Sequence, residues 1–179
     1  MSRRVIFGLL AGLVWPSQAT TLQQLSLADL ARQSTSIVRG TVQPSFTALR
    51  GSVIYTHYTV QVSEVWTGGG VQTLDVAVPG GVLNGAHQTY SGAPSFIPGQ
   101  DYVLFLWTSR SGLTQVMGLT QGLFAVNVVS GVPTVTRAAS SENLLSAGGQ
   151  AINDTNFSMK LSDFHTSVNQ MLGTIGVTN

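Results

Sequence analysis

Residues 53–66 read Val-Ile-Tyr-Thr-His-Tyr-Thr-Val-Gln-Val-Ser-Glu-Val-Trp, and this stretch decides the fold. Apolar and polar side chains alternate along it, which predicts a long β-strand. One face would carry Ile54, Tyr58 and Val60, and the other face would carry Tyr55 and His57. The chain is therefore expected to be built mainly from strands.

Two irregularities suggest that these strands are bent. The apolar series moves from Val62 to Val65, which breaks the period of two and indicates a β-bulge. Gly40 lies near the middle of the preceding strand, where a glycine marks a bulge or a close approach of two backbones. Bent, twisted strands predict a small β-barrel, closed or nearly closed, with an open sandwich as the alternative.

Five to seven strands are expected in all, lying between two helices. Besides 53–66, the strand candidates are residues 37–42, 74–78, 102–107, 113–119, 123–129 and 133–137. Residues 102–107 are apolar without interruption, as in a strand buried on both faces. Residues 138–158, rich in Ala, Ser, Gly and Asn, resemble a surface excursion.

The two helices are predicted from their caps and their apolar periodicity. A short helix is expected at residues 27–33, because Ser26 and Asp29 can form a capping box. A C-terminal amphipathic helix is expected at residues 162–172, where Phe164, Val168 and Met171 recur on one face.

The N-terminus has the pattern of a secretory signal peptide. Arg3 and Arg4 precede an apolar run at residues 5–15, and Ala19 ends a small-residue cleavage site. A membrane anchor is the alternative, but the run is shorter than the roughly 20 residues that a spanning helix needs. We therefore expect a signal peptide at residues 1–19 and one secreted or periplasmic domain at 20–179, with no membrane span after cleavage.

The composition excludes several classes of protein. Only 8% of the 179 residues are charged, and there is no Cys, which rules out a disulfide scaffold, a zinc ribbon and a thiol enzyme. Without residues 1–19, six basic and seven acidic residues remain, for a net charge of −1. Because nucleic-acid binding rests on a basic excess, we predict no nucleic-acid partner.

Several motifs resemble those of a family of secreted bacterial proteins of unassigned function. They are Val-Pro-Gly-Gly at 78–81, Ser-Gly-Ala-Pro-Ser-Phe at 91–96, Pro-Gly-Gln-Asp-Tyr-Val-Leu-Phe-Leu at 98–106 and Gly-Leu-Thr-Gln-Gly-Leu-Phe at 118–124. More remotely, their order is similar to the OB-like barrel of netrin-like modules and the tissue inhibitors of metalloproteinases. The resemblance implies a five-stranded bent barrel with a helix packed on it. It implies no function, because those inhibitors coordinate zinc through an N-terminal cysteine and this chain has none.

Four residues are candidates for contact with a partner: Tyr55, His57, His87 and Tyr90. Tyr55 and His57 share one strand face, while His87 and Tyr90 lie in the Gly-rich connection at 80–100, and loops often carry functional residues. The histidines lack H-x-x-x-H spacing, and no carboxylate lies within four residues of His57 or His87. We therefore predict no metal site, no cofactor and no catalytic residue.

These observations favour an exported, non-enzymatic module that binds another protein or an extracellular polymer. Association of edge strands into oligomers is a minor branch of this hypothesis. One alternative is an exported hydrolase or accessory factor that uses His87 with a serine from residues 80–100. The other is a protease inhibitor, suggested by fold analogy alone.

Overall fold

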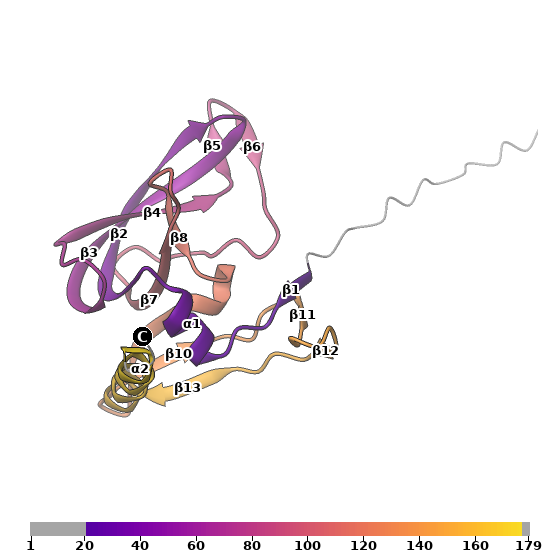
Figure 1. Ribbon diagram of the computed structural model, residues 1–179. Coiled ribbons are helices and arrows are strands. Elements are labelled where there is room, and N and C mark those ends of the chain that lie inside the picture. Colours follow the sequence, from indigo (N-terminus) through magenta and orange to yellow (C-terminus); the bar gives the residue numbers. More distant parts are fainter. Residues whose placement is uncertain (1–20, 177–179) are drawn as a thin grey trace, which may run out of the picture.

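The computed structural model describes residues 21–176, so the predicted signal peptide lies outside the described residues (Figure 1). The strands are β1 (Thr21–Gln23), β2 (Ser36–Arg50), β3 (Val53–Thr67), β4 (Thr73–Pro79), β5 (Gly81–Leu83), β6 (Ala86–Gln88), β7 (Asp101–Thr108), β8 (Thr114–Val116), β9 (Leu123–Val129), β10 (Val132–Arg137), β11 (Asn143–Leu145), β12 (Ala151–Ile152) and β13 (Phe157–Lys160). The helices are α1 (Leu27–Gln33) and α2 (Leu161–Gly176), and a 3₁₀ turn covers Leu119–Gly122. The protein is mainly β, as predicted.

The strands form one large sheet and two small ones. The large sheet has eight strands in the order β13-β10-β9-β7-β2-β3-β4, with β8 paired to β7, and its neighbours are antiparallel. In the second sheet, β1 pairs in parallel with β11, which pairs antiparallel with β12. The third is the β5–β6 hairpin.

Strand β7 is the centre of the fold, because its alternate side chains enter two separate cores. Val103 and Phe105 join a core that also contains residues of α1 and α2. Leu104 and Leu106 join a second core, on the other face, made largely of valines from β2, β3 and β4. Residues 102–106 are at most 4% exposed, so the prediction of a strand buried on both faces is confirmed for them, whereas Trp107 at the end is 44% exposed.

The large sheet is open and has eight strands within residues 21–176, whereas a closed or nearly closed barrel of five to seven strands was expected. Strand β4 lies against β8 without pairing with it, and within residues 21–176 no pairing joins the two edges, β4 and β13. The reason lies at β7, whose second edge is shared between β8 and β9. Strand β9 continues into β10 and β13, so strand pairing lengthens the sheet instead of closing it.

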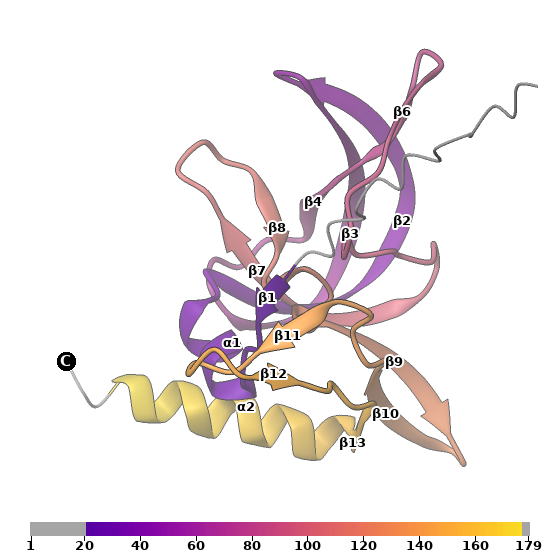
Figure 2. The same ribbon diagram turned by 90° about the vertical axis from the view of Figure 1, so that its right-hand side faces the viewer.

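Strands β2 and β3 are bent, and the predicted bulge is present. Their register shifts between Ile37 and Val38 and again between Arg39 and Gly40, which leaves Trp66 and Ser63 of β3 without a partner in β2. A further shift follows Val42. Beyond it, residues 45–58 form a curved extension of β2 and β3, here called the arm, which rises away from the helices and pairs along part of β3 with β4 (Figure 2).

The close backbone approach predicted at Gly40 is also present. A Cβ atom at this position would lie 2.4 Å from the carbonyl oxygen of Gln61 and 2.8 Å from Cγ1 of Val60. Because Gly40 pairs with β3 on one side and with Tyr102 of β7 on the other, the crowded backbone has no free direction in which to move.

Helices α1 and α2 cover the first core. Helix α1 spans Leu27–Gln33 and has the expected capping box between Ser26 and Asp29. Helix α2 begins at Leu161, and both Phe164 and Val168 are fully buried. None of the helices that the structure describes is long and apolar enough to cross a membrane.

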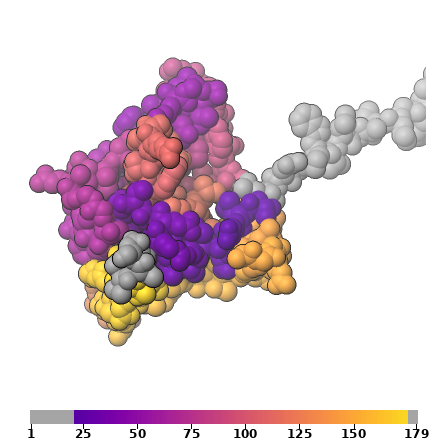
Figure 3. All heavy atoms as spheres, viewed as in Figure 1, coloured from indigo at the N-terminus to yellow at the C-terminus, as the bar shows by residue number. Residues whose placement is uncertain are grey.

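The segment at 138–158 is more ordered than a surface excursion, which corrects that expectation. It contains β11 and β12, and Leu144 of β11 is only 1% exposed. The space-filling view shows β11 and β12, in orange, directly beside β1, in indigo (Figure 3). Pairing with β1 therefore gives this segment its structure, since it satisfies backbone groups that a loop would expose to water.

Candidate functional site

An aromatic cluster lies on the outer face of the arm. His57 of β3 pairs in register with Phe46 of β2, and the two rings are stacked, with centroids 5.0 Å apart and planes 9° apart. On its other side, Nδ1 of His57 lies 2.8 Å from Oδ2 of Asp75 in β4. The ring of Tyr55 is 6.4 Å from that of His57 and tilted against it. These four residues are called the arm patch below.

Burial differs sharply within the arm patch. The side chain of His57 is 15% exposed, while Phe46 is 57% exposed and the side chain of Asp75 is 56% exposed. A carboxylate only accepts hydrogen bonds, so the Nδ1–H of His57 donates to Asp75 and fixes the tautomer. The histidine is therefore held from two sides, and it supports a phenylalanine ring that faces solvent.

The structure brings together only two of the four predicted contact residues. Tyr55 and His57 share the arm patch, as their strand face predicted. His87 lies opposite Val82 in the β5–β6 hairpin, which packs on the face of the arm that carries Ile54 and Thr56. The hairpin is therefore on the opposite face of the arm from His57.

Neither residue of the Gly-rich connection lies in a catalytic arrangement. His87 is exposed and has no hydrogen bond to any residue in the described part of the chain. Tyr90 is 43% exposed and lies beside Gly80. The hydrolase hypothesis requires a serine paired with His87, and residues 80–100 supply no such pair in this structure.

Sequence reasoning missed Phe46 and Asp75. Phe46 lies on β2 and Asp75 lies on β4, on either side of β3. The strand before β3 was expected to end at Val42, four residues before Phe46. A short signal was nevertheless present: apolar Phe46 and Ala48 flank polar Thr47, an alternation that continues the strand beyond Val42.

A charged network joins β2, β3, β7 and α2 on another part of the surface. The Nε–H of Arg39 donates to Asp101 at 2.8 Å, and its Nη1 donates to Glu64 at 2.5 Å. The indole N–H of Trp66 donates to the second oxygen of Glu64 at 3.0 Å. Burial alone would raise the pKa of Glu64, but the hydrogen bonds from Trp66 and Arg39 outweigh it and lower the pKa.

Two residues of this network, Trp66 and Glu64, have contacts within the protein that explain their positions. The ring of Trp66 packs against that of His165 in α2, with centroids 4.5 Å apart and planes tilted by 31°, and this contact joins the helix to the sheet. Both oxygens of Glu64 accept hydrogen bonds within the protein. We therefore assign Trp66 and Glu64 a structural role; Oδ2 of Asp101 accepts from Arg39, while its Oδ1 is buried without a hydrogen-bond partner among the described residues.

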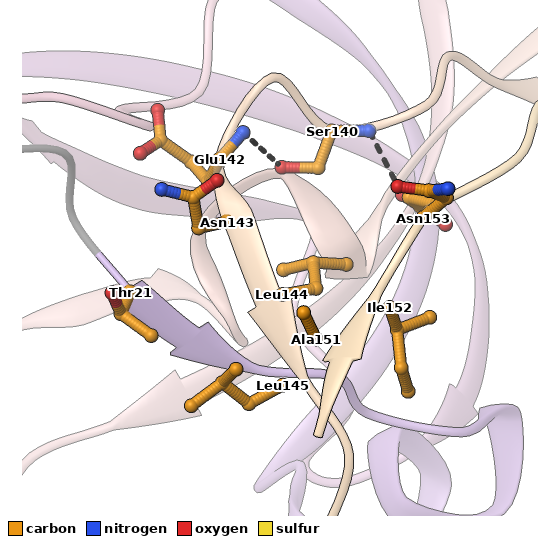
Figure 4. A pocket seen from close by; sticks show the side chains of 10 residues that line it. Thr21, Ser140, Glu142, Asn143, Leu144, Leu145, Ala151, Ile152 and Asn153 are labelled. Atoms are coloured by element: carbon orange, nitrogen blue, oxygen red, sulfur yellow. Dashed lines mark hydrogen bonds between the residues drawn. The ribbon is translucent and has the colours of Figure 1, made fainter. Parts of the chain in front are cut away.

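A hollow of about 420 Å³ lies over the second sheet (Figure 4). Ten residues line it: Thr21, Ser140, Glu142, Asn143, Leu144, Leu145, Ala151, Ile152, Asn153 and Asp154. Leucine, isoleucine and alanine side chains supply its apolar surface, and carboxylate, amide and hydroxyl groups supply the rest. This will be called the β11–β12 hollow.

One of the two carboxylates in the hollow is already neutralised. The side chain of Asp154 is 3% exposed and accepts from Arg137 through both oxygens, at 2.7 and 3.0 Å, and from the backbone N–H groups of Ser140 and Thr155. Burial alone would raise the pKa of Asp154, but these hydrogen bonds lower it. Asp154 therefore has a structural role.

Residues 21–176 contain no group of three or more His, Asp or Glu side chains placed to hold a metal ion. Comparison of the chain with protein-family models, with curated proteins and with solved structures found no match. Its function is therefore inferred from the geometry of these sites.

Proposed function

We propose that this protein is an exported, non-enzymatic module that binds another protein or an extracellular polymer through the arm patch. The observation that supports this most directly is the ring of Phe46, which is 57% exposed although it is stacked on His57. Residues 1–19, with their signal-peptide pattern, support export.

A fixed aromatic ring is well suited to binding. Immobilising a side chain at an interface costs roughly 0.5–1.5 kcal/mol of conformational entropy. Here the stack on His57, and the hydrogen bond from His57 to Asp75, restrain Phe46 before any partner arrives. Aromatic residues are also over-represented in interfaces, where a few of them supply most of the binding free energy.

The strand order gives a second line of support. Strands β8, β7, β2, β3 and β4 follow one another, and β4 lies against β8, and we interpret these five strands as an OB-like arrangement that remains open. OB-folds bind ligands on the face of their second and third strands and at the loop between the first and second. Strands β3 and β4 and the β2–β3 turn would occupy those places. This is an argument from fold analogy.

The test is capture of a partner with Phe46→Ala. Leu49→Ala is the matched control, because Leu49 is on the same strand, is 59% exposed and belongs to the other face of the arm. Tagged wild-type and variant proteins would be incubated with the exported fraction of the source cells, and the affinity of the recovered partner measured. We expect Phe46→Ala to weaken binding at least about tenfold, the equivalent of 1.4 kcal/mol, and Leu49→Ala to leave it nearly unchanged.

Two results would contradict the proposal. Equal affinity for wild type and Phe46→Ala would remove the arm patch from the interface. A wild-type chain that stays monomeric and retains nothing from the exported fraction would count against a binding module altogether. Recovery of a polysaccharide instead of a protein would identify the partner as a polymer.

A further inference from the structure

The outer edge of β2 along the arm has no partner strand among residues 21–176. Strand β7 pairs with β2 only from Ser36 to Thr41, so the same edge is uncovered beside residues 45–49, and it is here called the open edge. Figure 2 shows this part of β2 rising beyond β7. Residues 45–49 read Ser-Phe-Thr-Ala-Leu, without a charge or a proline. Charges and prolines commonly protect an exposed edge from pairing with another chain, and this edge lacks both.

The ladder with β3 identifies the backbone groups that point outward from the open edge. The N–H of Ile54 donates to the side chain of Gln88, and its C=O accepts from the N–H of Gly80, so both groups of Ile54 point away from β2. Leu49 lies opposite Ile54 in the antiparallel ladder. This pair is therefore non-hydrogen-bonded, and the N–H and C=O of Leu49 point to the open edge.

The same arrangement recurs at every second residue, because hydrogen-bonded and non-hydrogen-bonded pairs alternate. Ser45 and Thr47 therefore also direct their N–H and C=O groups outward, whereas Phe46 and Ala48 bond to β3. Within residues 21–176, the three N–H and three C=O groups of Ser45, Thr47 and Leu49 have no hydrogen-bond partner. A row of donors and acceptors with this spacing is complementary to the backbone of an extended polypeptide.

The β5–β6 hairpin supplies a floor beside the open edge. A Cβ atom on Gly81 would lie 2.6 Å from Oγ1 of Thr56 in β3 and 3.0 Å from Cγ2 of Thr47 in β2. One residue later, the carbonyl of Val82 accepts from the hydroxyl of Thr47 at 2.9 Å. Strand β5 therefore crosses the arm from β3 toward β2, on the face opposite the arm patch, and Leu83 follows at the open edge. Because Leu83 is on the same face of the hairpin as Gly81, its side chain points toward the space beside β2.

The hairpin also decides against a second copy of this chain as the occupant. Antiparallel pairing of two arms about a two-fold axis keeps the same face of both arms on one side of the joined sheet. Both β5–β6 hairpins would then meet beside Thr47 on that side, each in the space that the other requires. A strand from a different protein brings no such hairpin.

We propose that the open edge receives an extended strand of another protein, which adds to the sheet through the outward backbone groups of residues 45–49. The inference rests on the proposed function and narrows its partner to a polypeptide. Phe46 covers one face of the added strand, and Leu83 contacts the other. The partner strand therefore carries uncharged, mainly apolar side chains.

The first measurement tests the alternation itself, by hydrogen exchange of the free protein followed by NMR. We expect the amide protons of Phe46 and Ala48 to exchange slowly, because they bond to β3. Those of Ser45, Thr47 and Leu49 should exchange rapidly. Slow exchange of all five would show that the open edge is already covered, and would overturn the proposal.

The second measurement adds a synthetic probe, the peptide acetyl-Val-Thr-Val-Thr-Val-Thr-Val-amide, which is uncharged and favours extended structure. We expect saturating probe to slow exchange of the three outward amide protons at least about tenfold. The same peptide with an N-methylated backbone is the control, because it keeps the side chains and cannot donate to the open edge. Absence of saturable binding at millimolar probe would overturn the proposal.

Thr47→Pro is the variant that blocks the open edge. Its ring removes the outward N–H of residue 47 and projects into the place of the added strand, while the bonds between β2 and β3 remain. Thr47→Ala is the matched control, because both variants lose the hydroxyl that donates to Val82 and only the proline loses the N–H. We expect Thr47→Pro to weaken binding of the probe at least about tenfold, and Thr47→Ala less than about threefold. Equal affinities of the two variants would overturn the proposal, and the exchange measurement decides it independently of whether Thr47→Pro folds.

The variants also separate this inference from the proposed function. A partner from the exported fraction that is lost with Phe46→Ala, but bound equally by Thr47→Pro and Thr47→Ala, would retain the arm patch and overturn strand addition. A polysaccharide partner would overturn it as well. Self-association of the wild type that slows the same three amide protons without the probe would overturn the choice of occupant in favour of a second copy.

Discussion

The two ends of strand β2 present apolar side chains to opposite environments. At its start, Ile37 is fully buried in the core that Phe105 and Phe164 share beneath the helices. Near its other end, Phe46 is 57% exposed and rests on a histidine that is itself held by a carboxylate. An apolar side chain is buried in the core at one end of the strand and faces solvent at the other. The comparison separates residues that maintain the structure from residues to which we assign binding under the proposed function.

The largest effect is expected at the buried end. Phe164 is fully buried and contacts Trp66, Phe105, Phe124 and Phe157 through its ring. Phe164→Ala should destabilise the protein by about 3–5 kcal/mol, because it leaves a cavity where four rings meet. Urea unfolding would measure the loss. Gln170→Ala, at an exposed position of α2, is the control. A loss of less than about 1 kcal/mol in Phe164→Ala would refute the contrast between the buried and the exposed end of β2.

An intermediate effect is expected between the two ends, at Gly40. A methyl group there would meet the backbone of Gln61 at 2.4 Å, so β2 and β3 would have to separate. Gly40→Ala should cost about 1–3 kcal/mol, the usual range for overpacking. Gly69→Ala, where an added Cβ has no atom within 4 Å, is the matched control. If both variants unfold at the same urea concentration as wild type, the close approach of Gly40 to Gln61 does not affect the free energy of unfolding.

The smallest effect on stability is expected at the exposed end. Phe46→Ala removes a half-exposed ring and one stacking contact, so its free energy of unfolding should fall by at most about 1 kcal/mol. The same variant should lose binding, as proposed above. A loss of stability similar to that of Phe164→Ala would show that Phe46 is a structural residue, and the contrast between the two ends of β2 would fail.

Features that depend on side chains within a single strand could be predicted from the sequence. Alternation placed Tyr55 and His57 on one face, and the one-residue slip after Val62 revealed the bulge, because both signals lie within a single strand. The partners of His57 depend instead on the pairing of three strands. The register shift after Val42 decides which residue of β2 reaches His57, and a shift by one would turn Phe46 to the other face.

The open sheet and the second sheet could not be predicted for related reasons. Strands β11 and β12 have three and two residues, too few for a period to be visible. Their fold depends on β1, which is far away in the sequence. Closure was decided by how β8 and β9 divide one edge of β7, and hydrophobic patterning does not specify which edge a strand will join.

The pairing of β1 with β11 also sets an order on folding. Thr21 is among the first described residues, yet its partner is Asn143, so β1 has nothing to pair with until most of the chain has been synthesised. Contacts of such long range form late, because the intervening chain must first be brought together. Strand β1 therefore stays unpaired until β11 has emerged from the ribosome, so the second sheet is completed only after most of the large sheet has been synthesised.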